Sequence, residues 1–209
     1  MRCALAIGIV AAITSRAAAD GVYVLQSVGI GRARGDLEPT VGNAIRTRLA
    51  AGARVRWLAV EPWLQSDVHP SRTGGYLAGL VGGDPVAGHA DLASYGFDVK
   101  LAGPIYRAPT GERLEVYVRG GPFIATATGA LDGFRGYGAG MSAGVQLTGE
   151  VRALGFLWAP LFLTRRGPKV LGSLYFDQGV ELCRLESAGR ALDARVVHVA
   201  LGFGVATGF

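Results

Sequence analysis

The last thirteen residues of the chain, 197–209, read VHVALGFGVATGF, and they are the most informative segment for the class of fold. Its odd-numbered positions are large apolar residues, apart from Thr207, and its even-numbered positions are small, apart from His198. Side chains of a β-strand point alternately to opposite faces, so this strand has one apolar face and one nearly bare face. In a membrane β-barrel the apolar face meets lipid, while the other face lines a crowded interior. The stretch therefore predicts the closing strand of a transmembrane barrel.

The opposite end of the chain has the layout of a secretory signal peptide. Met1 and Arg2 form a short basic start, an apolar run extends from Cys3 to Ile13, and Ala17-Ala18-Ala19 offers a small-residue cleavage site. A run of eleven apolar residues is well short of the roughly 20 that a spanning helix needs. We therefore predict a signal peptide over residues 1–19 and a single domain over residues 20–209.

The amino-acid composition excludes several classes of protein. Half of the chain is apolar, yet the part after residue 19 has no run of 18 apolar residues, which argues against a helical membrane protein. The formal charge of +5 falls to +3 without Arg2 and Arg16, and the other arginines are scattered, so no nucleic-acid partner is expected. Cys183 is the only cysteine outside the predicted signal peptide, so no internal disulfide can form.

Period-two alternation recurs along the whole domain and predicts its strands. The expected strands cover residues 22–32, 43–57, 58–65, 92–101, 114–127, 137–147, 171–185 and 197–209. Residues 151–163 are apolar with weak alternation and fit either a strand or a connection, and residues 76–81 fit a short strand within a glycine-rich loop. A bacterial barrel needs an even number of strands. We favour an all-β, antiparallel up-and-down barrel of eight strands over one of ten.

The remaining segments are predicted to connect the strands. Turns are expected over residues 104–112 and 129–136, and a polar loop over residues 186–195. Two longer loops, over residues 33–43 and 67–90, are where contacts at a surface would form, because function on such scaffolds sits in loops.

Charged residues fall on the face of these strands that would point inward. They are Arg46, Arg48, Asp98, Lys100, Glu115, Arg119, Asp177 and Glu181. An eight-stranded barrel is just wide enough to be filled by side chains, and buried charges need partners of opposite sign. We favour a packed ionic plug over the alternative of a charged pore lining.

The chain resembles the small outer-membrane β-barrel proteins of the OmpA/OmpX-like superfamily. The stretches that carry the resemblance are GVYV at 21–24, VYVRGG at 116–121, GYGAG at 136–140 and the aromatic end at Phe209. The resemblance implies a non-catalytic barrel in the outer membrane of a Gram-negative bacterium, with a role in envelope structure, surface contact or slow solute passage. It also implies that outer-membrane lipid surrounds the barrel and that the barrel-insertion machinery reads Val205, Thr207 and Phe209.

The sequence offers little to support other chemistry. The letters G-A-G-M-S-A at 138–143 match a dinucleotide motif but lie inside an alternating segment, without the helix that the motif needs. His69, His89 and His198 are far apart, so neither a metal site nor a cofactor is expected. Lipid A deacylases of similar shape carry an H-x-S pair on a late strand, whereas this chain has His198-Val199-Ala200 and lacks the nucleophile. The remaining alternative is a soluble periplasmic, lipocalin-like barrel that binds an apolar ligand.

Overall fold

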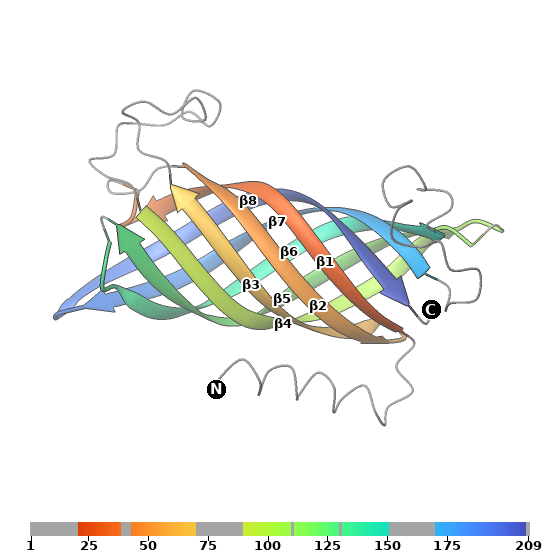
Figure 1. Ribbon diagram of the computed structural model, residues 1–209, viewed down its shortest axis with the longest axis horizontal. Coiled ribbons are helices and arrows are strands. Elements are labelled where there is room, and N and C mark those ends of the chain that lie inside the picture. Colours follow the sequence, from red (N-terminus) through yellow and green to blue (C-terminus); the bar gives the residue numbers. More distant parts are fainter. Residues whose placement is uncertain are drawn as a thin grey trace.

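The computed structural model of the chain is a closed β-barrel (Figure 1). It describes residues 21–38, 43–69, 90–109, 111–129, 131–150 and 170–207. The strands are β1 (Gly21–Gly35), β2 (Asn43–Val55), β3 (Leu58–His69), β4 (Ala90–Arg107), β5 (Arg113–Gly129), β6 (Arg135–Glu150), β7 (Val170–Ser187) and β8 (Arg190–Thr207).

Neighbouring strands pair antiparallel in chain order, and the first strand pairs with the last. The β1–β8 pairing extends from Val22 opposite Thr207 to Gly35 opposite Ala194. Because the ring is closed, no edge is left to pair with another chain. The prediction of eight antiparallel strands is confirmed, and the closed ring excludes ten. Residues 76–81 and 151–163, which were the two uncertain segments, lie outside the described residues. In the part of the chain that the structure describes, no helix has the length and apolarity needed to cross a bilayer.

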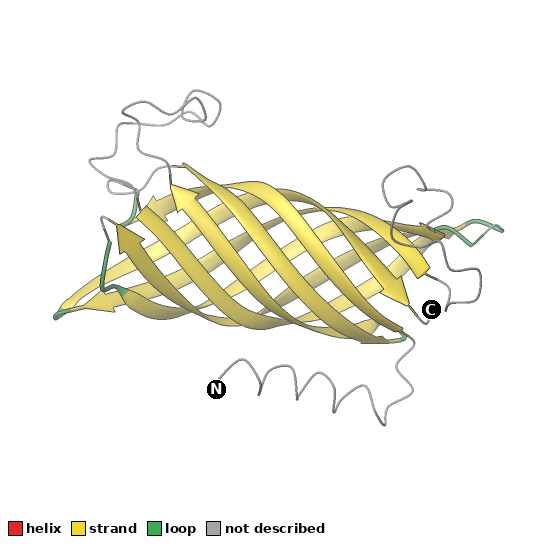
Figure 2. Cartoon of the chain, viewed as in Figure 1, coloured by secondary structure: helices red, strands yellow, loops and turns green. Residues whose placement is uncertain are grey.

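The chain termini and the turns between strands are divided between the two ends of the barrel. β1 begins and β8 ends at the same end, on the right of Figure 1, which we call the terminal end. The turn at residues 56–57 and the turn between β4 and β5 also lie there; in the latter the amide of Ala108 donates to the carbonyl of Glu112 over 2.8 Å. The turns from β5 to β6 and from β7 to β8 lie at the opposite end, which we call the loop end (Figure 2).

The outward face of every strand carries exposed, large apolar side chains. One from each strand, in order, is Val24, Leu49, Leu64, Phe97, Val118, Met141, Phe176 and Leu201. On β8 the outward positions are those that the sequence predicted, with Val197, Val199, Leu201 and Phe203 exposed.

Inward glycines make room for inward aromatic rings. Gly52 lies opposite Tyr23, and Gly202 lies opposite Tyr175. A Cβ added at Gly202 would lie 2.3 Å from Cζ of Tyr175, and one added at Gly52 would lie 2.3 Å from Cζ of Tyr23. The same arrangement recurs in two further register pairs, Tyr117–Gly144 and Phe123–Gly138. The glycine content of the chain therefore has a packing reason, because each ring occupies the space above a residue that has no side chain.

Several strand ends differ from those predicted. The predicted loop over residues 67–90 was wrong at its start, because β3 continues to His69 and buries Asp67 in the barrel. The predicted strand over residues 43–57 ends at Val55, because Arg56 adopts a φ of 56° and turns the chain without a glycine.

The predictions for three connections were also wrong in extent. The turn expected over residues 104–112 is shorter, since β4 reaches Arg107 and β5 begins at Arg113. The polar loop expected over residues 186–195 is a two-residue turn, with φ of 47° at Ala188 and 81° at Gly189. The loop expected over residues 33–43 starts later, since β1 continues to Gly35. At the loop end β1 and β8 carry polar outward residues, so the apolar alternation used for the prediction stops before these two strands do. At the terminal end the register of β4 shifts between Pro104 and Tyr106, which interrupts the alternation there.

Candidate functional site in the barrel interior

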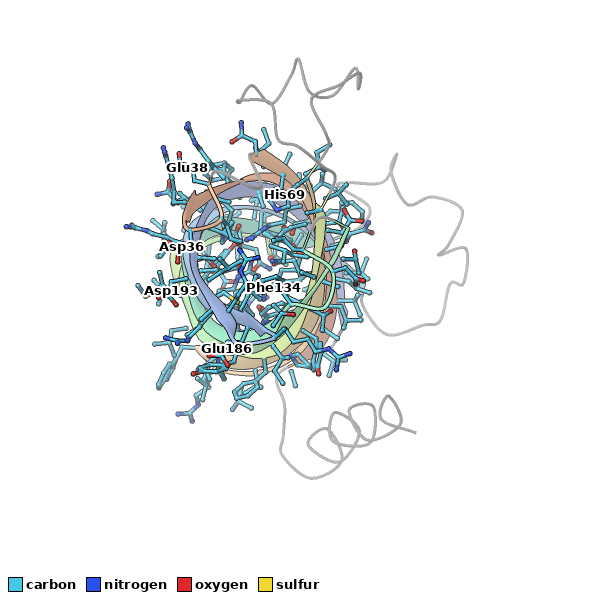
Figure 3. The ribbon with its side chains drawn as sticks, turned by 90° about the vertical axis from the view of Figure 1, so that its left-hand side faces the viewer. Asp36, Glu38, His69, Phe134, Glu186 and Asp193 are labelled. Atoms are coloured by element: carbon cyan, nitrogen blue, oxygen red, sulfur yellow. The ribbon has the colours of Figure 1, made fainter. Side chains whose placement is uncertain are left out.

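The interior of the barrel is filled by charged and polar side chains rather than by an apolar core. All eight residues that the sequence placed inward are buried, and Asp177 has no exposed surface. Figure 3 looks into the barrel from the loop end and shows side chains within the ring of strands. The charged residues form three groups along the barrel, described here from the loop end to the terminal end.

Arg46 on β2 holds two carboxylates at once. Its Nε and Nη2 donate to the Asp67 carboxylate over 2.8 and 2.9 Å. Its Nη1 and Nη2 donate to the Glu181 carboxylate over 2.9 and 2.8 Å. Gln65 donates to both carboxylates, at 3.2 Å from Oδ2 of Asp67 and 3.3 Å from Oε2 of Glu181. Because β2 and β7 are not neighbours, the Arg46–Glu181 pair crosses the lumen.

Glu61 and Arg119 form the middle group with their partners. Glu61 is fully buried; it accepts a hydrogen bond from the Tyr23 hydroxyl over 2.6 Å and lies 3.3 Å from Nζ of Lys100. Arg119 pairs with Glu61 at 3.4 Å and with Asp177 through Nη2. Its Nε donates to the Ser142 hydroxyl over 3.0 Å. These contacts join β1, β3, β4, β5, β6 and β7 across the lumen.

An aromatic ring supports a further pair in this group. Arg48 donates to Asp98 over 2.5 Å, and its guanidinium carbon lies 4.4 Å from the centroid of the Trp63 ring. The indole nitrogen of Trp63 donates to the other oxygen of Asp98 over 3.1 Å. The ring therefore stacks on the cation and binds the anion of the same pair, which fixes the positions of both.

The third group lies near the terminal end. Arg54 binds Glu115 through two hydrogen bonds of 2.8 Å, and this pair spans the barrel from β2 to β5. Lys100 donates to Oε1 of Gln146 over 2.8 Å. A cavity of about 20 Å³ lies among these side chains, which is the space of a single water molecule.

Apolar side chains occupy the interior at the loop end. Leu37, Leu131 and Leu185 are almost wholly buried, and Phe134 packs against the same cluster. Leu37 and Leu131 lie in connections between strands, so the connections contribute to the filling of the mouth.

The sequence analysis missed several members of the network. Glu61, Asp67 and Arg54 hold, respectively, the partners Lys100, Arg46 and Glu115. The signal was present, because residues 59 to 69 alternate with an inward set of Ala, Glu, Trp, Gln, Asp and His. The strand predicted over residues 58–65 ends before Asp67, and the prediction assigned no charged residue of this segment to the interior.

The other residues singled out by the sequence lie apart from any reactive arrangement. His198 is buried in the lumen near the middle of β8, opposite Gly31 and Gly179. Cys183 is a free, half-buried thiol. In the described ranges no group of three His, Cys, Asp or Glu residues is arranged to hold a metal ion. Val205 lies on β8 opposite Val24 and Thr207 ends that strand, whereas Phe209 lies outside the described residues.

Chemically, this interior neutralises charge by mutual pairing. Each of the cations Arg46, Arg48, Arg54, Lys100 and Arg119 contacts at least one carboxylate. A buried ion pair is tolerated where its geometry is good and its remaining donors are satisfied. The bidentate contacts of Arg46 and Arg54 have this form.

Comparison with known proteins gives matches in structure only. No family model matches the chain, and no curated protein matches its sequence. Neisserial surface protein A is 14% identical with a TM-score of 0.49, covering 90% of this chain and 97% of that one. The attachment invasion locus protein Ail of Yersinia pestis is 11% identical with a TM-score of 0.40, covering 89% of this chain and 98% of that one. A major outer membrane protein from Thermus thermophilus is 17% identical with a TM-score of 0.31, covering 88% of this chain and 98% of that one.

Proposed function

We propose that this protein is an integral outer-membrane β-barrel without catalytic activity, whose closed lumen makes it an anchor for its loops at the cell surface. The observation that carries the proposal is the inverted polarity of the barrel. Large apolar side chains such as Leu64 and Leu201 are more than 60% exposed, while the carboxylates of Glu61 and Asp177 are fully buried. Water would favour the opposite arrangement, whereas hydrocarbon around the barrel favours this one.

The dimensions and the composition of the outer surface support the same proposal. The strands are 12 to 18 residues long, and a tilted strand needs about 9 to 11 residues to cross the hydrocarbon. On β8 the outward residues from Val197 to Val205 are uncharged, and the same holds on β1 from Val22 to Ile30. Exposed Trp57 and Tyr106 near the terminal end and Tyr137 near the loop end fit the aromatic girdles of such barrels.

The filled interior supports an anchor rather than a channel. Ion pairs such as Arg46–Glu181 and Arg54–Glu115 join strands that are not neighbours and cross the lumen. The same interior disfavours a lipocalin-like role, because a lipocalin keeps an open apolar cavity for its ligand. In this proposal the terminal end faces the periplasm, the insertion machinery reads the end of β8, and the loop end faces outward.

A charged residue placed on the outward face tests whether that face meets hydrocarbon. Leu201 lies midway along the apolar part of β8, and its side chain is 65% exposed. In a membrane Leu201→Arg should lower the free energy of unfolding by about 2–4 kcal/mol. In a soluble barrel the same change would be nearly neutral, because the side chain already faces water. The matched control is Ala191→Arg near the loop end of β8, which should have little effect.

The measurement is urea unfolding of the mature chain, residues 20–209, refolded into lipid vesicles, with heat-modifiable gel migration as the check of folding. Fractionation of expressing cells should place the protein in the outer-membrane pellet. A mature chain that is folded and monodisperse in buffer without detergent, or a neutral Leu201→Arg, would overturn the proposal.

A further inference from the structure

Exposed arginines gather on one side of the barrel, at its loop end. Five outward-facing residues, from β1, β6, β7 and β8, form what we call the arginine arc: Arg32, Arg34, Arg135, Arg184 and Arg195. The strands of the opposite side, β2 to β5, carry no arginine at their described outward positions at this end. Their outward residues there are Asn43, Ser66, Val68, Asp91, Thr126 and Thr128.

The strand register makes the arc contiguous. Arg34 lies directly opposite Arg195. Arg184 lies opposite Asp193, two positions along β8 from Arg195, and Arg135 lies opposite Glu186, two positions along β7 from Arg184. Diagonal neighbours of this kind are about 7–8 Å apart, within reach of long side chains. The arc is therefore one surface across four adjacent strands.

The arc also lies at one height along the barrel. At this height the band of outward-facing apolar side chains, which we call the apolar belt, ends. The next outward residue toward mid-barrel is Ile30 before Arg32, Leu182 before Arg184 and Val197 before Arg195. Tyr137, which is 66% exposed, takes the same place beside Arg135. Acidic residues come only further out: Asp36 and Glu38 on the β1 side, Glu186 on β7 and Asp193 on β8. In a membrane this depth is that of the lipid headgroups.

The positive charge of the arc is only partly neutralised within the protein. Glu38 pairs with Arg32 and Arg34, and Glu186 pairs with Arg184 at 2.9 Å. Arg135 and Arg195 have no carboxylate partner among the described residues. Like charges directly opposite each other on a sheet are destabilising, and in the pair of Arg34 and Arg195 only Arg34 has a carboxylate partner to offset this.

We propose that the arginine arc binds the phosphate groups of anionic lipids in the outer leaflet. Guanidinium groups bind phosphate through paired hydrogen bonds, and a row of them just beyond the apolar belt contacts headgroups while the belt contacts the acyl chains. The backbone amide of Asp193 donates to the Asp36 carboxylate over 2.9 Å, which ties the β1 side of the arc to β8. This inference depends on the membrane location proposed above.

The test compares two double variants that remove the same charge. Arg135→Gln with Arg195→Gln removes the two arc residues that lack a carboxylate partner, and Arg56→Gln with Arg107→Gln removes two exposed arginines at the terminal end. Each purified mature chain in neutral detergent is titrated with phosphatidic acid, a phosphomonoester lipid, and with phosphatidylcholine, and bound lipids are counted by native mass spectrometry. Heat-modifiable migration shows that each variant is folded.

We expect the wild type to prefer phosphatidic acid. The arc variant should bind this lipid roughly ten- to thirty-fold more weakly, since each arginine near an anionic surface contributes about 1 kcal/mol. The terminal-end variant should keep the wild-type affinity. Equal losses in the two variants, or no loss in either, would overturn the proposal.

Inositol hexakisphosphate, a soluble polyphosphate, separates the two sources of phosphate. Binding of this compound to the arc without retention of phosphatidic acid would overturn the lipid as the ligand. The wild type could fold in detergent and Leu201→Arg could destabilise it in vesicles, while the protein shows no preference for phosphatidic acid. This combination would overturn the lipid-binding inference and leave the proposed membrane location intact.

Discussion

At the scale of single residues, the interior is built from pairs in which one residue provides either the space or the opposite charge that the other residue needs. The ring of Tyr175 lies over Gly202, and the guanidinium of Arg46 lies between Asp67 and Glu181. A side chain at Gly202 would take the space of the Tyr175 ring, and loss of Arg46 would leave two carboxylates without a cation. The two kinds of pair therefore give two separate predictions.

A side chain at Gly202 should displace the Tyr175 ring. The Cβ of alanine would lie 2.3 Å from Cζ of Tyr175 and 2.5 Å from the carbonyl oxygen of Gln26, so the ring and the backbone must both shift. Overpacking of this kind costs typically about 1–3 kcal/mol. We expect Gly202→Ala to lower the free energy of unfolding in vesicles by this amount. Gly103→Ala is the control, because no atom lies within 4 Å of its added Cβ. Equal effects at both positions would show that space for the ring is not what the glycine provides.

Removal of Arg46 should leave two buried carboxylates without their cation. A buried charge that loses its partner costs about 3–5 kcal/mol, so Arg46→Met is expected to destabilise the barrel by this amount in urea unfolding. Neutralising the partners as well, with Asp67→Asn and Glu181→Gln, should restore most of the loss. Arg184→Gln is the comparison, because its pair with Glu186 is exposed and the change should have little effect. A triple variant as unstable as the single one would argue that Arg46 acts by its volume and not by its charge.

At the scale of elements, the class of fold and the faces of the strands could be predicted from the sequence, whereas the strand ends could not. Alternation is strong where the outward face carries large apolar side chains and the inward face lines a filled lumen, as in β8 between Val197 and Phe203. It weakens where a strand extends past the apolar belt, because polar residues are then acceptable on both faces. For this reason the strand that begins at Arg190 was predicted to be a loop up to residue 195.

The candidate site could be predicted in kind but not in its connections. Residues such as Arg119 and Asp177 were placed inward by parity, and the structure adds that they pair although β6 lies between their strands. A pair across a lumen depends on the stagger of the strands around the ring, which a single strand's pattern does not contain. Glu61 is a different case, because the alternation of β3 already indicates an inward position and only its partners depend on the stagger.

The turn between β7 and β8 gives a prediction for an element. Ala188 and Gly189 both have positive φ, as in the type I′ turns that favour Asn-Gly or Gly-Gly. Alanine is strained in this conformation, and asparagine tolerates it better. We expect Ala188→Asn to raise the free energy of unfolding by about 1 kcal/mol or less. The same substitution at Ala191, an exposed position within β8, should give no gain. A loss of stability at Ala188 would argue that this turn has another form in the folded barrel.

At the scale of the whole molecule, the ion pairs and the closed ring act together. Each pair that crosses the lumen, such as Arg54 with Glu115, links two strands that are not neighbours in the ring and so share no backbone hydrogen bonds. The ring in turn fixes the lumen at a width that the side chains fill. The barrel and its filling therefore support each other, and an open conducting path would require several cross-lumen pairs to separate at once.

This coupling predicts that the protein does not conduct ions. In a planar bilayer, the wild-type mature chain should give no steady single-channel openings, because the groups around Arg46, Arg119 and Arg54 occupy successive depths of the lumen. The same preparation must show heat-modifiable migration, so that silence reflects a closed barrel and not a failure to fold. The Arg46→Met variant, whose partners Asp67 and Glu181 lose their cation, is expected to give brief openings at most, since the groups of Arg119 and Arg54 still fill the lumen below it. Steady openings of the wild type would contradict the plug and would favour solute passage as the role of the barrel.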